Sequence, residues 1–273
     1  MLGILLIRKE KGCSSHDVVN QIRRKFGTRR VGHAGTLDPQ ATGLLIVAVG
    51  PATRFLQYLP LEPKKYIGRI RFGVETETYD SEGRVVAEID PPKDLENRIH
   101  DTLPQFRGLI QQLPPMYSAV KIDGRPLYSY ARQGQELKRE PRTVHIGTFE
   151  IIEGSAPEWA FSVVCSGGTY VRSLAHDLGK AVGCGAHLSG LERVGVGRFS
   201  LDEAVSVEDV GPEHLKSLSE ALPPMPLLEV TQTQMEHVRD GRPIGLASPP
   251  DSNLAALLEP GGTVFAVARI HGN

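Results

Sequence analysis

Residues 31–50 read VGHAGTLDPQATGLLIVAVG, and this stretch joins a glycine-rich loop to an apolar strand. The second part, residues 44–50 (LLIVAVG), is a continuous apolar run, which is typical of a strand covered on both faces. The first part, residues 31–43, holds three glycines and a proline together with His33 and Asp38. Binding and catalytic residues often gather on such loops when a rigid sheet holds them.

Taken singly, these residues have ordinary structural explanations. Asp-Pro sequences form turns, because the Asp side chain accepts hydrogen bonds from nearby amides and Pro fixes φ. An isolated His33 would be a plain core or loop histidine. Gly32 and Gly35 nevertheless let the backbone approach a ligand closely, since they carry no Cβ. Whether Asp38 is a turn residue or a reagent therefore depends on the rest of the chain.

Outside this stretch, strands outnumber helices. Residues 14–27 predict a helix that starts at a Ser-Asp cap and stops at Gly27. Residues 64–73 (KKYIGRIRFG) alternate between apolar and polar positions, which predicts a strand. Residues 85–89 (VVAEI) are expected to return as its hairpin partner. Further strands are predicted at 3–7, 143–152, 159–171, 188–200 and 262–270, and further helices at 53–59, 94–107, 172–179 and 212–222.

Two segments interrupt this pattern. Residues 112–143 are polar, basic and irregular, with three tyrosines interleaved, which indicates an insertion. Residues 223–226 (PPMP) are typical of a rigid linker. We therefore expect a first domain over residues 1–224 and a small all-β module, a barrel, over residues 225–273.

Composition and cysteine usage narrow the class of protein. The 273 residues are 40% hydrophobic and 23% charged, as in ordinary globular proteins. The three cysteines lie far apart and form no CxxC pair, so neither a disulfide framework nor a zinc knuckle is indicated. This favours a reducing, cytoplasmic compartment. The apolar N-terminal residues 1–7 are too few for a membrane span, so we expect no membrane association.

Charge is distributed unevenly although the net charge is only −1. Residues 200–273 contain 11 acidic and 4 basic residues, which leaves residues 1–199 with about +6. Two basic clusters, residues 8–30 and 107–142, lie in this first part. Such asymmetry permits a face that binds a polyanion, although solvated helix faces would look similar.

Several common chemistries are absent from the sequence. It has no Walker A motif, no HExxH, no GxSxG and no dinucleotide fingerprint. We expect neither a metal nor a cofactor. Without them, a carboxylate such as Asp38 would have to act alone as nucleophile or base.

Several segments, in order, resemble the TruB-type tRNA pseudouridine synthases. The first is the opening loop itself, GHAGTLDPQATGLL. Lys9-x-x-Gly12 followed by Ser14-Ser15 is similar to the N-terminal motif of this family. The other matching segments are KY with GRIRFG at 65–73, GVETETYDSEG at 73–83, PMYSAVK at 115–121, YSYARQG at 128–134, CSGGTYVR at 165–172 and GCGAHLSGLER at 183–193.

The resemblance implies a fold and an activity. The fold would be α+β, with a mixed, largely antiparallel sheet, flanking helices and a cleft across the middle, plus a short C-terminal PUA-like β-barrel. The activity would be the isomerisation of uridine 55 to pseudouridine in the T-arm loop of tRNA. The substrate would be the T-arm stem-loop, with no cofactor and no obligatory protein partner, and the enzyme would be a monomer.

The resemblance also assigns catalytic roles. Asp38 would be the essential carboxylate, and three paths stay open: attack on C1′, attack on C6, or removal of the 2′ proton. Arg172 would pair with Asp38 and keep it ionised. Tyr66 would lie against the target base and help to remove the C5 proton.

Substrate-binding residues are implied in the same way. His33 would fill the space that the flipped base leaves, and Leu191 would form an apolar wall. Gly32 would let the backbone approach the substrate. Lys9 and the insertion would grip the RNA backbone. The insertion residues implied in this contact are Tyr117, Lys121 and Arg132.

Two departures from the family pattern and two rival functions complete the hypothesis. Arg8-Lys9-Glu10 replaces the usual Asp-Lys-Pro, and Thr78-Tyr79-Asp80 replaces Thr-Ser-Asp. One rival is a tRNA-binding chaperone with little catalysis, which the set of Asp38, Tyr66 and Arg172 disfavours. The other is a guide-RNA-dependent synthase subunit, which lacks the insertion at residues 112–143.

Overall fold

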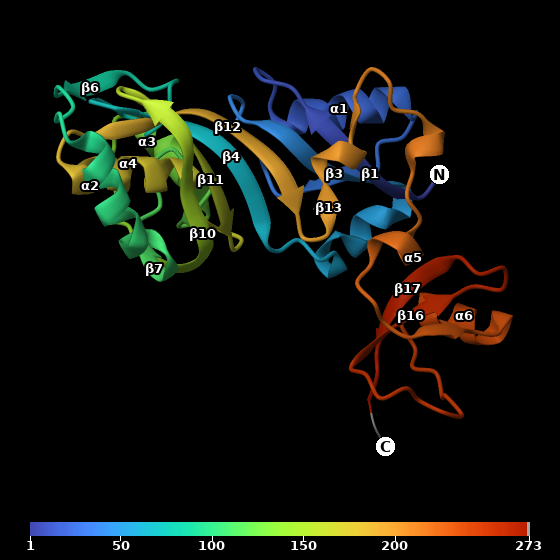
Figure 1. Cartoon of the computed structure of the whole chain (residues 1–273). Coiled ribbons are helices and arrows are strands. Elements are labelled where there is room, and N and C mark those ends of the chain that lie inside the picture. The colour runs from blue at the N-terminus through green and yellow to red at the C-terminus, as the bar shows by residue number, and fades with distance from the viewer. Residues whose placement is uncertain (272–273) are drawn as a thin grey trace.

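The computed structural model describes residues 1–271, and its main body is built on one large mixed sheet (Figure 1). The strand order is β14-β1-β3-β12-β4-β11-β10-β7, with β13 beside β12 and β2 beside β3. Its strands are β1 (Gly3–Lys9), β2 (Val31–Ala34), β3 (Thr42–Val49), β4 (Lys64–Phe72), β7 (Gly108–Gln112), β10 (Arg142–Ser155), β11 (Glu158–Cys165), β12 (Ala186–Val196), β13 (Phe199–Ser200) and β14 (Val205–Ser206). Only the pairs β1–β14 and β3–β12 are parallel, which confirms the mixed, largely antiparallel sheet.

Short helices and small sheets flank this body. The helices are α1 (Ser15–Lys25), α2 (Leu95–Thr102), α3 (Leu127–Ala131), α4 (Val171–Val182), α5 (Leu218–Ala221) and α6 (Gln232–Arg239), with 3-10 turns η1 (Gly50–Tyr58), η2 (Leu103–Phe106), η3 (Leu201–Glu203) and η4 (Pro212–His214). The small sheets are β5 (Val74–Thr76) with β6 (Val85–Glu88), β8 (Lys121–Ile122) with β9 (Arg125–Pro126), and β15 (Leu227–Glu229) with β16 (Leu254–Leu258) and β17 (Val264–Arg269).

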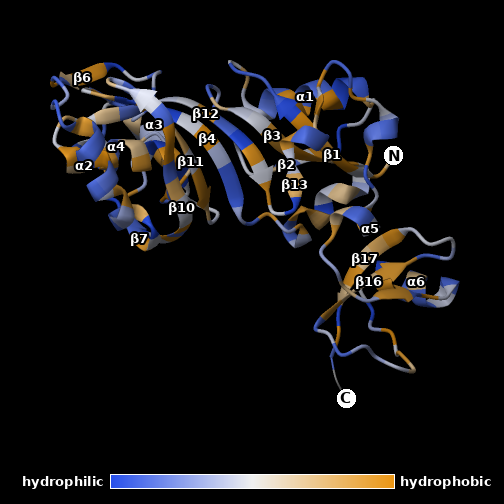
Figure 2. Ribbon diagram, viewed as in Figure 1, coloured by the Kyte–Doolittle hydropathy of each residue, from blue (hydrophilic) through white to orange (hydrophobic). Residues whose placement is uncertain are grey.

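Separate apolar cores stabilise the two halves of the sheet. Helix α1 begins at a capping box between Ser14 and Asp17 and buries Val18 and Ile22 against β1 and β3. Helices α2 and α4 cover the other half, where Leu174 and Phe161 are part of one cluster. Figure 2 shows apolar residues along these strands and helices. Strands β12 and β4 run between the halves, so the middle of the sheet is where a cleft can open (Figure 1).

Strand β2 was not expected. The segment VGHA was predicted as part of a long loop, because Gly32 weakens a strand pattern. In the structure it pairs with β3, Val31 lying opposite Val49. Strand β12 covers this edge of β3 only at Thr42 and Gly43. The remaining edge is therefore free for β2, and tertiary pairing overrides the weak local propensity.

The predicted hairpin between the strand at 64–73 and VVAEI is wrong. Both edges of β4 are occupied, by β12 and by β11. The chain turns away at Gly73, whose φ is +89°. Strand β6 therefore pairs with β5 instead.

Two predictions for the C-terminal part also need correction. The helix expected at 212–222 is split, because Lys216 exchanges backbone hydrogen bonds with Ile4 of β1. The module after the linker is not all-β: helix α6 starts at a capping box between Thr231 and Gln234. Its sheet is an open set of three strands among the described residues rather than a barrel.

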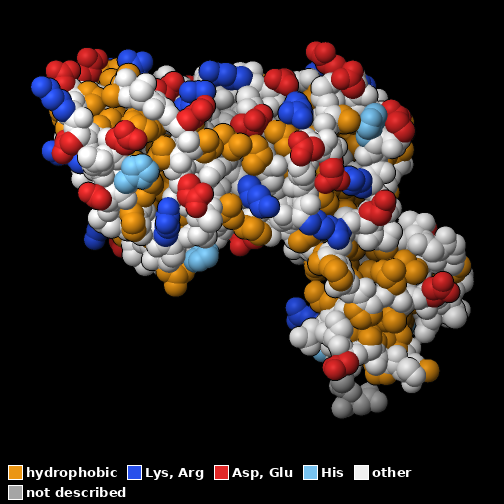
Figure 3. Space-filling model, viewed as in Figure 1, with side chains coloured by type: hydrophobic (Ala, Val, Ile, Leu, Met, Phe, Trp, Pro, Cys, Tyr) orange, Lys and Arg blue, Asp and Glu red, His pale blue; other side chains and the backbone are white. Residues whose placement is uncertain are grey.

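The module has a small core of its own and projects from the main body beside α5 (Figure 1). Val230, Met235 and Leu257 form this core. On the face seen in Figure 3, basic and acidic side chains are interspersed over the main body without one dominant sign. No helix among residues 1–271 is long and apolar enough to cross a membrane.

Candidate active site

The loop that carries Asp38 is held by the segment between β1 and α1. The Ser15 hydroxyl donates to the Leu37 carbonyl (3.0 Å) and accepts from the Leu37 amide (2.8 Å). The Gly12 amide donates to the Pro39 carbonyl at 2.8 Å. These bonds lie on both sides of Asp38 in the sequence, so they present its side chain from a fixed backbone.

Arg172, near the start of α4, joins two carboxylates. Its Nη2 lies 3.2 Å from Oδ2 of Asp38, and its Nη1 lies 3.3 Å from Oδ2 of Asp80. Nη2 also donates to the carbonyl of Tyr117 at 2.8 Å. The expected ion pair between Asp38 and Arg172 is therefore present. The second carboxylate was not expected.

Asp80 is itself fixed by its own turn. The Thr78 hydroxyl donates to Oδ1 of Asp80 at 2.5 Å, and the Glu82 amide donates to the same oxygen at 3.1 Å. Asp80 lies in one of the segments that resemble the family, but no pairing with Arg172 was predicted for it. Because one guanidinium serves two carboxylates, the cluster carries a net charge of about −1 when both are ionised.

Opposing effects act on the protonation of Asp38. Desolvation by the surrounding protein raises the pKa of Asp38, and the Arg172 guanidinium lowers it. The carboxylate keeps 48% of its side-chain surface exposed, so water in the cleft limits the desolvation. The pKa of Asp38 is raised on balance, so its ionised form is a stronger base than a fully solvated aspartate.

A cleft of about 480 Å³ opens in front of Asp38. Tyr66 from β4 lines it, and burial raises the pKa of this tyrosine, whereas Arg193 opposes the shift. Of the other predicted residues, Arg172, Leu191, Tyr117 and Arg132 line the same cleft. Lys64 and Asp80 line it too, although neither was predicted as a site residue.

Four predicted substrate-binding residues lie elsewhere. Lys9 was expected to grip RNA, but it is completely buried. Its Nζ donates to the carbonyls of Glu10, Cys13 and Pro39, so it anchors the Asp38 loop instead. A side chain at Gly32 would meet η1 rather than a ligand. His33 and Lys121 do not line the cleft.

His33 and Lys121 differ in exposure. His33 is half-buried, and burial followed by the charge of Arg193 lowers its pKa. Lys121 is exposed on the β8–β9 hairpin, where it remains free to contact a polyanion outside the cleft.

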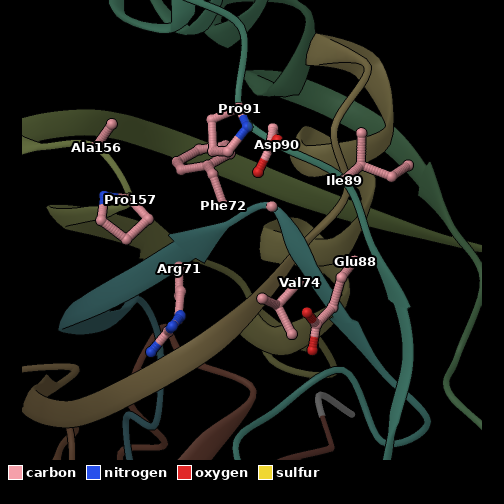
Figure 4. Close-up of a pocket in the computed structure, with 10 residues that line it drawn as sticks. Arg71, Phe72, Val74, Glu88, Ile89, Asp90, Pro91, Ala156 and Pro157 are labelled. Atoms are coloured by element: carbon pink, nitrogen blue, oxygen red, sulfur yellow. The ribbon is translucent and has the colours of Figure 1, made fainter.

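A larger hollow of about 650 Å³ lies at the end of β4 (Figure 4). Its walls come from the end of β4, from β6 with the segment after it, and from the turn before β11. Arg71, Asp90 and Pro157 are among the lining residues. None of the predicted residues lines it. Among residues 1–271, no cluster of His, Cys, Asp and Glu could hold a metal ion. The smaller cleft, which Asp38, Tyr66 and Arg172 line, is the candidate active site.

Family models cover most of the chain. Residues 23–171 match the N-terminal domain of the TruB family of pseudouridylate synthases. Residues 172–227 match the C-terminal domain of tRNA pseudouridylate synthase B.

Individual proteins are similar over most of their length. The tRNA pseudouridine synthase B of Syntrophotalea carbinolica is 44% identical, over 94% of this chain and 84% of its own. That of Bacillus pumilus is 38% identical, over 98% and 93%. Among solved structures, one chain of a Cbf5-Nop10-Gar1 complex superposes with a TM-score of 0.67 at 26% identity, over 98% of this chain and 78% of that chain.

Proposed function

The chain belongs to the TruB family of pseudouridylate synthases, and from this membership we propose that it isomerises uridine 55 in the T-arm loop of tRNA. Relatives named tRNA pseudouridine synthase B, at about 40% identity over most of the chain, make it a tRNA pseudouridine synthase. The position of the target uridine and the role of each residue are the parts that we propose.

One observation supports the mechanism most: Asp38 is paired with Arg172 inside the cleft that Tyr66 lines. The isomerisation breaks the N1–C1′ bond, turns the uracil and joins C5 to C1′. The uracil is both the leaving group and the incoming nucleophile, so no cofactor is required. Asp38 supplies the essential carboxylate, and Arg172 keeps it charged and oriented.

The target nucleotide must leave its loop stack to reach Asp38. Flipping a nucleotide costs a few kcal/mol, and stacking a base on an aromatic ring returns about 1–3 kcal/mol. Tyr66 provides such a ring at the cleft wall, with Leu191 on an apolar side. Stacking therefore offsets most of the cost of flipping.

The insertion supports direct recognition of tRNA without a guide RNA. It carries exposed cations close to the cleft, and the guanidinium of Arg132 lies 5.4 Å from the centre of the Tyr128 ring. Tyr117 and Arg132 reach the cleft itself. We propose that the insertion contacts the T-arm and that residues 1–224 act as a monomeric catalytic domain. We propose residues 225–273 as a second domain, which the small apolar cluster of Val230, Met235 and Leu257 supports.

The test is release of the C5 hydrogen from tRNA that carries uridine labelled at C5. Wild type should release it from the T-arm loop alone, and Asp38→Asn should bind tRNA equally well but lose turnover by several orders of magnitude. Turnover by Asp38→Asn near the wild-type rate would refute the mechanism. Tight tRNA binding without any release by wild type would favour the chaperone function, and release that needs a second RNA would favour the guide-dependent one.

A further inference from the structure

We propose that Arg193 is a positioning residue for Tyr66: its free Nη1 holds the Tyr66 oxygen as the base that removes the C5 proton. This inference rests on the proposed function, because it concerns the second half of the same reaction. Arg193 belongs to β12 and does not line the cleft. It would act through Tyr66 rather than on the substrate.

The two residues are neighbours in the sheet. Arg193 lies directly opposite Tyr66 in the antiparallel pair of β12 and β4. Directly opposite residues share a face of a sheet, so their side chains lie side by side. Arg193 is completely buried, and Tyr66 is only 7% exposed. The guanidinium therefore lies in a dry region behind the tyrosine.

The hydrogen bonds of Arg193 leave one nitrogen free. Nε donates to the Leu44 carbonyl and Nη2 to the Gly35 carbonyl, both at 2.8 Å. These two carbonyls lie on either side of Asp38 in the sequence, so Arg193 also holds its loop. Nη1 has no partner. A buried unpaired N–H is costly, so Nη1 can donate to an acceptor that comes within its reach during the reaction.

Tyr66 is the best placed acceptor. Arg193 lies close enough to the Tyr66 hydroxyl to favour its ionised form, but Nη1 and this oxygen form no hydrogen bond in the structure. The other groups that influence Tyr66 do not help, because the Asp38 carboxylate and the Cys165 thiol both raise the pKa of Tyr66. Burial raises the pKa of Cys165 to about 11, so this thiol stays neutral.

Two lysines lie near Arg193. Burial, and more weakly the charge of Arg193, lowers the pKa values of Lys9 and Lys64. The same two effects lower the pKa of His33. Lys9 is already bonded to three carbonyls. A negative charge on the Tyr66 oxygen would thus lie close to positively charged side chains. Of these, Arg193 both lies directly opposite Tyr66 in the sheet and has an unpaired donor.

Removal of the C5 proton follows formation of the C5–C1′ bond. The ionised Tyr66 oxygen then takes the C5 hydrogen as a proton. The electron pair of the C–H bond forms the C5–C6 double bond, and the C6–N1 π pair moves to N1, which takes a proton from water. The Tyr66 phenol then returns its proton to water. Arg193 stabilises the oxygen anion before this transfer.

Two substrates separate this role from a merely structural one. Release of the C5 hydrogen from uridine tRNA requires the Tyr66 step, whereas 5-fluorouridine in the same tRNA has no C5 hydrogen to remove. We expect Arg193→Lys to slow single-turnover reaction of uridine tRNA by at least about 10-fold more than consumption of 5-fluorouridine tRNA, because a point charge cannot replace the planar fork. In a Tyr66→Phe background, the same change should slow uridine tRNA only by the factor seen with 5-fluorouridine tRNA, because the contacts of Arg193 to the Asp38 loop are still lost.

Ser15→Ala is the matched control. It removes two hydrogen bonds from the Asp38 loop but lies away from Tyr66, so both substrates should slow by the same factor. Equal slowing of both substrates by Arg193→Lys would overturn the proposal. If wild type itself released no C5 hydrogen, the proposed function would fail instead.

A second measurement covers the case in which Arg193→Lys does not fold. The proposal needs an ionised Tyr66 oxygen, so the ratio of uridine to 5-fluorouridine turnover by wild type should rise with pH, and Tyr66→Phe should abolish this rise. A ratio that does not change with pH would overturn the proposal.

Discussion

At the scale of single residues, Arg172 contacts three groups at once, so a substitution of Arg172 alters all three contacts. Its two terminal nitrogens reach Asp38, Asp80 and the carbonyl of Tyr117. A planar fork can span these positions, whereas a lysine offers one point charge. The charge of the cluster and its geometry therefore depend on the same side chain.

Arg172→Lys should lower kcat on the order of 100-fold while tRNA affinity stays within a few-fold, since the lost contacts orient Asp38 rather than bind RNA. Single-turnover kinetics and filter binding measure the two quantities. The matched control is Arg69→Lys, on an exposed arginine that lies 3.7 Å from Glu158, which should leave both unchanged. A near-normal kcat for Arg172→Lys would mean that the pair is only structural.

His176 gives the stability a pH dependence. Its ring stacks on Tyr79 at 3.7 Å, and burial lowers its pKa from 6.5 to about 4. Between these two pH values His176 is protonated in the unfolded chain but neutral in the folded protein. The free energy of unfolding should therefore decline as pH falls from about 6.5 to about 4.

His176→Phe should flatten this part of the curve, because it keeps an aromatic partner for Tyr79 and removes the titrating group. Urea unfolding at a series of pH values measures the effect. His100→Phe, on an exposed residue of α2, should keep the wild-type slope. The same slope in His176→Phe as in wild type would contradict the assignment.

At the scale of elements, the joint between β3 and β12 positions the catalytic loop. Gly43 has φ +101°, and a Cβ there would lie 2.4 Å from the carbonyl oxygen of Arg193. This contact is with backbone, which cannot move without shifting β12. The strand that carries Arg193 and Leu191 thus approaches the end of the Asp38 loop only because residue 43 has no side chain.

Gly43→Ala should therefore destabilise the fold by several kcal/mol, more than the 1–3 kcal/mol or so of backbone strain alone. Gly134→Ala is the matched control, since φ is +70° there and nothing lies within 4 Å of its Cβ. It should cost only the strain. Denaturant unfolding compares the two, and equal losses would show that the close approach at Gly43 is not tight.

At the scale of the whole molecule, charge is divided between the two ends of the chain. The first 199 residues carry about +6 and the remainder −7. On the face seen in Figure 3 no basic patch dominates. The polyanion surface is expected around the cleft and the insertion, because Arg132 of the insertion lines the cleft. The acidic C-terminal module should add little electrostatic attraction.

The affinity for tRNA should depend strongly on salt. About five phosphate contacts would give a slope near −3.5 for log K against log salt. Lys121→Ala should reduce this slope by about 0.7, because it removes one exposed cation of the insertion. Arg242→Ala, on the C-terminal module, should leave it unchanged. A wild-type slope near zero would exclude the insertion as an electrostatic RNA surface.

The sequence by itself determined the local elements and the family. Helix α1 with its cap, the apolar strand β3, the alternation of β4 and the loop around Asp38 all follow from contiguous residues, because caps and periodicity act within a few positions. The resemblance carried by several motifs added the fold, the substrate class and the pairing of Asp38 with Arg172.

Only the tertiary structure decided which distant residues meet. It brings Asp80 to Arg172, places Arg193 opposite Tyr66 and buries Lys9, which was expected to grip the RNA backbone. It also pairs β6 with β5 rather than with β4. The physical reason is the same in each case. A strand pairs with whichever strand edge is free, and a charged side chain is buried where unpaired carbonyls or opposite charges are available. Both depend on segments far away in the sequence, so a local sequence pattern cannot predict them.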